Sequence, residues 1–160
     1  MNTHWTFMFA AALLLASPHS SFAEDPIVAK VKAEIAPFCT GNAGEYGDSF
    51  LLREDLNNDK IDDYIFDYGE SPCASGFCGS AGCTVSIWLS SNGNFKEAYS
   101  SNLRSWVLVE GNGRKSLVTG MHGSACNLPG AAECNIELKF KGTKVAKSRF
   151  KGKIDWQRAQ

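Results

Sequence analysis

The predictions for this chain start from one stretch: Asp55-Leu56-Asn57-Asn58-Asp59-Lys60-Ile61-Asp62-Asp63-Tyr64-Ile65-Phe66-Asp67-Tyr68. Its first half places oxygen-bearing side chains at alternate positions, and one more carboxylate follows after four residues. Calcium takes about six to eight oxygen ligands, including a backbone carbonyl from the middle of such a loop. The spacing therefore predicts a site for one calcium ion, formed by the side chains of Asp55, Asn57, Asp59 and Asp63 and the carbonyl of Ile61.

The alternative for this loop is a polar, solvated turn without a metal, because Asp and Asn favour turns in any case. The second half of the stretch, residues 64–68, is rich in aromatic and β-branched side chains. Such residues are typical of strands, so the loop is expected to run directly into a strand.

The first residues have the features of a leader. Residues 7–16 form an apolar run that is too short to span a membrane, and Ser21-Phe22-Ala23 follows as a small-x-small cleavage site. We therefore expect residues 1–23 to be a signal peptide and the mature chain to be exported, to the periplasm or beyond. The alternative is an uncleaved membrane anchor.

Composition limits the chemistry of the mature chain. The leader contains no Lys, Arg, Asp or Glu, so the mature chain keeps all 16 basic and 17 acidic residues. Because no basic excess remains, neither nucleic acid nor an anionic membrane is expected as a partner. His122 is the only histidine left, which excludes zinc sites with several histidines and restricts any histidine-based triad to that residue.

Six cysteines lie in the mature part: Cys39, Cys73, Cys78, Cys83, Cys126 and Cys134. An even number of cysteines in an exported chain predicts disulfides. A metal-thiolate site is the alternative, but the regular spacing of five residues in the first loop is not that of a zinc ribbon.

Residues 24–48 are expected to form an N-terminal helix and a linker. Asp25 is a good N-cap and Pro26 suits the first helical position. An apolar stripe then recurs at helical spacing, and Pro37 ends the pattern. The stripe consists of Ile27, Val28, Val31 and Ile35.

Residues 49–160 are expected to form a single β domain. Alternating apolar residues and β-formers predict its first four strands at residues 49–54, 63–68, 84–89 and 95–99. Asn92-Gly93 between the last two is a strong signal for a type I′ hairpin turn.

The second half of the domain repeats the first. When Cys126 is set on Cys73, and Cys134 on Cys83, the strand patterns of residues 116–119, 135–140 and 144–150 coincide with those of the first half. The fold class expected is therefore mainly β, with two antiparallel β-meander units at about 49–99 and 104–150, a short N-terminal helix and disulfide bracing.

Only the first unit is expected to bind an ion. The second unit has Asn112 and Ser116 at the positions of Asp59 and Asp63, so its turn lacks the carboxylates.

The first unit resembles the FG-GAP/VCBS repeat, the integrin-type calcium repeat of β-propeller blades. Its pattern is Asp-x-Asn-x-Asp-Gly-x-x-Asp, an apolar strand, and a later strand that ends in Asn-Gly-x-Phe. The matching segments here are the loop at 55–63, Tyr64-Ile65-Phe66, and Trp88-Leu89-Ser90-Ser91-Asn92-Gly93-Asn94-Phe95, with Lys60 in place of the Gly. The chain as a whole looks like small secreted bacterial proteins with one such loop. The resemblance implies a calcium-stiffened β module for binding or stability, and it implies no reaction.

The internal repeat also predicts a disulfide map. Cys73 and Cys83 are expected to bracket one loop, and Cys126 and Cys134 the equivalent loop of the second unit. These pairs, Cys73–Cys83 and Cys126–Cys134, leave Cys39 for Cys78.

The function expected is that of an exported binding module with a protein partner in the envelope, such as an inhibitor or immunity protein. The chain is not expected to be an enzyme. The alternatives are a small envelope hydrolase, which would use Asp62 and Asp67 beside the loop with help from His122 or the metal, and a purely structural envelope protein.

Four aromatic residues near the loop allow one further interpretation. Tyr64, Phe66, Tyr68 and Trp88 could stack on sugar rings, but cross-strand packing is the interpretation that the pattern favours.

Overall fold

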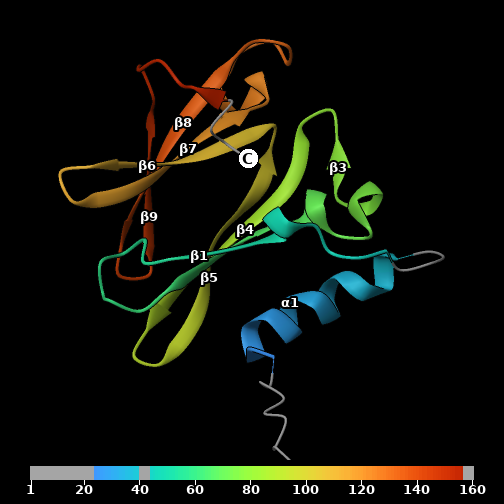
Figure 1. The fold of residues 1–160 in the computed structure, drawn as a ribbon. Coiled ribbons are helices and arrows are strands. Elements are labelled where there is room, and N and C mark those ends of the chain that lie inside the picture. The colour runs from blue at the N-terminus through green and yellow to red at the C-terminus, as the bar shows by residue number, and fades with distance from the viewer. Residues whose placement is uncertain (1–23, 40–43, 157–160) are drawn as a thin grey trace, which may run out of the picture.

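The computed structural model describes residues 24–39 and 44–156, and shows a mainly β protein with two antiparallel sheets (Figure 1). The expected signal peptide at 1–23 and residues 40–43 of the expected linker lie outside the described residues.

The N-terminal helix α1, Pro26–Ile35, begins where the sequence predicts. The Asp25 side chain caps it by accepting a hydrogen bond from the Ile27 amide at 3.1 Å. The apolar stripe predicted from the sequence is buried, and Val31 and Ile35 are fully excluded from solvent.

The first sheet follows the helix. Its strands are β1 (Leu51–Glu54), β2 (Asp63–Asp67), β3 (Cys78–Gly79), β4 (Gly82–Ser91) and β5 (Asn94–Leu103). Strand β4 is central, because it pairs with β2, β3 and β5, and β1 pairs with the far side of β2.

The second sheet is a meander of consecutive strands, in the order β6 (Ser105–Gly111), β7 (Arg114–Met121), β8 (Cys134–Lys141) and β9 (Lys144–Arg149). The hairpin turn predicted in the first sheet is confirmed, since Asn92 and Gly93 have φ of 51° and 77°, as a type I′ turn requires. Strand β3 is an addition that the sequence did not predict. Both sheets are antiparallel, and in the first β1, β2, β4 and β5 form a meander to which β3 adds a short pairing with β4. A shared repeat origin stays a prediction.

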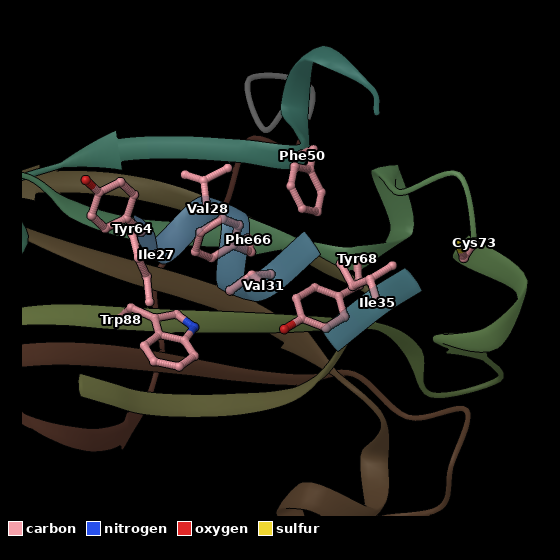
Figure 2. Close-up of a cluster of buried hydrophobic side chains, with 10 residues drawn as sticks. All are labelled: Ile27, Val28, Val31, Ile35, Phe50, Tyr64, Phe66, Tyr68, Cys73 and Trp88. Carbon is pink, nitrogen blue, oxygen red and sulfur yellow. The ribbon is translucent and has the colours of Figure 1, made fainter. Parts of the chain in front are cut away.

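The first sheet lies between α1 and the second sheet. Side chains on a strand alternate between its two faces, so neighbouring residues of β2 enter different cores. Phe66 of β2 packs toward the helix with Val31, as Figure 2 shows, whereas Ile65 belongs to the core shared with the second sheet. The aromatic residues discussed above, Tyr64, Phe66, Tyr68 and Trp88, are at most 8% exposed. Their interpretation as packing residues is confirmed, and they form no open platform for a sugar.

The chain crosses from one sheet to the other at Arg104, between β5 and β6. The start of β4 passes close to this crossing. Gly82 has φ of 102°, and a Cβ there would lie 2.0 Å from the carbonyl oxygen of Leu103. Glycine is needed at this position for both reasons.

The predicted disulfide map is partly wrong. Cys126–Cys134 is confirmed, but Cys39 pairs with Cys73 and Cys78 with Cys83, in place of the expected Cys73–Cys83 and Cys39–Cys78 bridges. The reason is β3, which places Cys78 directly opposite Cys83 in the ladder with β4. Cys73 is therefore free to pair with Cys39, which follows α1. The helix is tied to the first loop as expected, but through Cys73 instead of Cys78.

Candidate functional site

The acidic loop is held by hydrogen bonds between its own side chains and its own amides. The Asp55 carboxylate accepts from the amides of Asn58 at 2.8 Å, Asp59 at 3.1 Å and Lys60 at 2.9 Å. Asn57 Oδ1 then accepts from the Asp59 amide at 3.0 Å, and Asp59 Oδ1 accepts from the Ile61 amide at 2.9 Å. The alternate spacing of oxygen-bearing residues therefore produces a chain of tight turns, as Asp and Asn side chains allow.

Lys60 takes a left-handed backbone conformation, with φ of 69°. This is the position where the FG-GAP/VCBS pattern has Gly, which adopts such a φ without steric cost. The loop thus holds an unfavourable residue in a left-handed conformation, and the bond from the Lys60 amide to Asp55 helps to hold it.

Asp63 is the first residue of β2, is fully buried, and connects the loop to β4. Its carboxylate accepts from the amides of Leu56 at 2.8 Å, Asn57 at 3.2 Å and Ser90 at 2.7 Å. Burial raises the pKa of this carboxyl group, and the amide donors act in the opposite direction. Asp63 therefore connects the start of the loop to the end of β4.

Asp59 is the more accessible carboxylate of the loop. The Ser90 hydroxyl donates to Asp59 Oδ2 at 2.7 Å, and this bond is the main cause that lowers the pKa of Asp59. Ser90 thus contacts both Asp59, through its hydroxyl, and Asp63, through its amide.

The predicted calcium ligands fit calcium in their chemistry, because every donor is a carboxylate, amide or carbonyl oxygen. Their arrangement in the structure, however, is not that of a metal site. Within the part of the chain that the structure describes, no three acidic, histidine or cysteine side chains gather closely enough to hold a metal ion. The carboxylates instead face amide and hydroxyl donors.

The residues suggested for a hydrolase are not brought together. Asp62 is exposed, whereas Asp67 is bound between the sheets, where it accepts from Trp106 Nε1 at 2.8 Å and from the Gly69 amide at 2.9 Å. The two carboxylates therefore do not form an acid and base pair.

His122 caps the short helix Gly123–Cys126 through its side chain. Its Nδ1 lies 2.7 Å from the Ser124 hydroxyl and accepts from the Ser124 amide at 3.3 Å. Among the described residues, no carboxylate is hydrogen-bonded to this imidazole. Nδ1 is the atom that caps the helix, so the contacts with Ser124 fix the position of the imidazole at the helix start.

A second region, which the sequence did not predict, joins the two disulfide-bracketed loops. Arg104 donates to the Ser80 carbonyl at 3.1 Å and to the Gly130 carbonyl at 2.9 Å, through the same nitrogen, Nη2. We call residues 69–81 and 122–133, joined in this way, the paired-loop surface; it lies at one end of the molecule (Figure 1). No sequence signal marks Arg104, because its partners lie 24 and 26 residues away.

Comparison of the chain with protein-family models, with curated proteins and with solved structures found no match in any of the three. The likeness to the FG-GAP/VCBS repeat therefore stays a prediction from the loop sequence. No helix within residues 24–39 and 44–156 is long and apolar enough to cross a membrane.

Proposed function

We propose that this chain is an exported binding module, stiffened by one calcium ion, which recognises another envelope protein, such as a hydrolase that it inhibits, through the paired-loop surface. The observation that carries the proposal is Arg104, which clamps two loops from different sheets together through their backbone carbonyls. Loops held on a rigid scaffold are where proteins most often place recognition residues.

Covalent bracing supports this role. All three disulfides have at least one cysteine in the paired-loop surface or at its border. Loops that are ordered before binding lose less conformational entropy when a partner binds. Leu128, which is 38% exposed, provides an apolar contact in the second loop.

The test is affinity capture from envelope extract with the mature protein as bait. Leu128→Asp should abolish capture of the partner, because a charge would replace an exposed apolar contact. Ser100→Asp, a matched change at an exposed position of β5, should leave capture intact. Equal capture by both variants, or no specific protein with the unmodified bait, would refute the proposed surface.

The calcium ion of this proposal would be held by Asp55, Asn57, Asp59, the carbonyl of Ile61 and Asp63. When bound, the ion would neutralise the carboxylates of the loop and hold the loop against β4. The support is the oxygen-only donor set at calcium spacing, and the proposal requires Asp55 and Asp59 to turn part of their coordination from amides to the ion.

Calcium should raise the melting temperature, because an ion that binds only the folded state stabilises it by mass action. We expect weak affinity, of order 10⁻⁴ M, as in extracellular modules. Asp59→Ala should abolish the difference between excess calcium and excess chelator, while Asp62→Ala, an exposed acid outside the proposed ligand set, should preserve it. An unmodified protein that melts at the same temperature in calcium and in chelator would exclude the site.

A further inference from the structure

Charge is divided unequally between the two halves of this nearly neutral chain. Residues 24–103 carry 13 acidic and 5 basic residues, whereas residues 104–160 carry 4 acidic and 11 basic residues. The second sheet and its flanking segments are therefore strongly cationic, which the total charge conceals. Such a field attracts anionic ligands.

The cations gather at one end of the second sheet, where β7 begins, β8 ends and β9 begins. Lys141 lies directly opposite Lys144 in the β8–β9 ladder. Like charges in opposed positions destabilise a sheet, so this pair is not explained by stability. Arg114 and Lys139 stand at the same end, on β7 and β8.

Two acids lie among these cations, and each already faces a lysine. Glu137 is bound to Lys139 at 3.0 Å and to the Ser116 hydroxyl at 2.9 Å, and Glu110 lies opposite Lys115 in the β6–β7 ladder. Arg114, Lys141 and Lys144 are exposed and form no ion pair within the part of the chain that the structure describes.

Arg114, Lys139 and Lys141 border a cleft of about 890 Å³ between the acidic loop and the second sheet. Ligand sites commonly have volumes of roughly 300–1,000 Å³, so the cleft can hold a ligand of several rings. Its charged lining consists of four cations, Arg114, Lys115, Lys139 and Lys141, and two acids, Glu110 and Glu137, beside the polar side chains of Asn57, Asn58, Asn112 and Ser116. The cleft thus offers an excess of positive charge beside amide and hydroxyl groups.

We propose that this cleft binds an acidic oligosaccharide, a chain of sugar rings that carry carboxylates. Its carboxylates would pair with Arg114 and Lys141, and its hydroxyls would bond to the amides and to Ser116. An acidic protein segment suits the cleft less well, because the centres of protein interfaces are enriched in aromatic residues and depleted of Lys. Phe140 is the aromatic residue that lines this cleft.

Isothermal titration of the mature protein with hexagalacturonate in low salt tests the proposal. The unmodified protein should bind it and should ignore a neutral glucose hexamer. Arg114→Ala/Lys141→Ala should weaken binding about tenfold, because two exposed charge contacts are lost. These residues have no ion-pair partner, so the double variant leaves no carboxylate unpaired and should keep the melting temperature of the unmodified protein.

The matched control is Lys151→Ala/Lys153→Ala, which removes the same charge from the exposed C-terminal segment. It should change the affinity by less than about twofold if binding is local to the cleft rather than a property of net charge. Equal losses in the two double variants would overturn the proposal, as would absence of binding to the unmodified protein. Tighter binding of hexaglutamate, lost in the Arg114/Lys141 variant, would assign the cleft to an acidic protein segment and overturn it as well.

Discussion

At the scale of single residues, Asp63 has the most demanding position in the loop. It is expected from sequence as a metal ligand, and the structure shows it buried with three backbone amides as donors. Buried donors that lose their acceptor cost free energy, because water cannot replace it. Asp63 is therefore needed for folding whether or not an ion binds.

Asp63→Asn replaces one acceptor oxygen by an amide donor that faces other donors. We expect a loss of about 2 kcal/mol in the free energy of unfolding, measured by urea denaturation in chelator. Asp62→Asn, the same change at the exposed neighbour, should stay within about 0.5 kcal/mol. Similar values for the two variants would show that the amide bonds to Asp63 contribute little.

Tyr64 provides a prediction on pH. Burial raises its pKa to about 12, and its hydroxyl hydrogen bond to Asp25, the helix cap, acts in the same direction. Because the pKa in the folded state lies above the unfolded value of 10.0, the resulting stabilisation is complete below pH 10. It is lost as the pH rises from 10 through about 12.

Asp25→Asn should lower the pKa of Tyr64, since the negative charge disfavours the tyrosinate, but burial should keep the pKa above 10.0. Titration of absorbance at 295 nm measures this, and a Tyr64→Phe protein identifies the signal of this residue. A Tyr64 that titrates near pH 10 in the unmodified protein would contradict the prediction.

At the scale of elements, the helix depends on its bridge to the first loop. Cys39–Cys73 spans 34 residues, whereas Cys78–Cys83 spans 5 within the β3–β4 ladder. In the chain-entropy account, a longer closed loop restricts the unfolded chain more. The two bridges should therefore differ in their effect on stability.

Replacing both cysteines of a bridge by Ala tests this difference. Loss of Cys39–Cys73 should cost about 4 kcal/mol and loss of Cys78–Cys83 about 2 kcal/mol, as measured by denaturant unfolding. Non-reducing peptide mapping of the unmodified protein checks the pairing itself. A peptide that links Cys73 to Cys83 would restore the map expected from the repeat.

At the scale of the whole molecule, the sheets share one apolar core. Leu117 and Leu138 of the second sheet are fully buried against Ile87 and Leu89 of the first. The Glu54–Lys115 ion pair and the bond from Asn58 Nδ2 to the Gly113 carbonyl also join the sheets. Neither sheet buries its inner face alone, so they should fold together.

Leu138→Ala should therefore destabilise both sheets at once, by about 3 kcal/mol, through lost apolar burial and a residual cavity. Thermal unfolding should remain a single transition when it is followed both by tryptophan fluorescence and by far-ultraviolet circular dichroism. If the two signals changed at separate temperatures, the sheets would be independent units.

The sequence by itself determined the features that depend on neighbouring residues. Asp25-Pro26 predicted the start of α1, apolar alternation predicted the main strands, and Asn92-Gly93 predicted the hairpin. Each of these signals acts through local backbone preferences or through the face that a side chain occupies, and both can be read from spacing.

Tertiary structure alone decided which distant groups meet. The short strand β3 has little pattern of its own, and it redirected Cys78 to Cys83 and Cys73 to Cys39. Arg104 and the cationic cleft are likewise made of contacts between segments far apart in the chain. Such contacts depend on how the two sheets pack, and the spacing of residues in the sequence does not predict that packing.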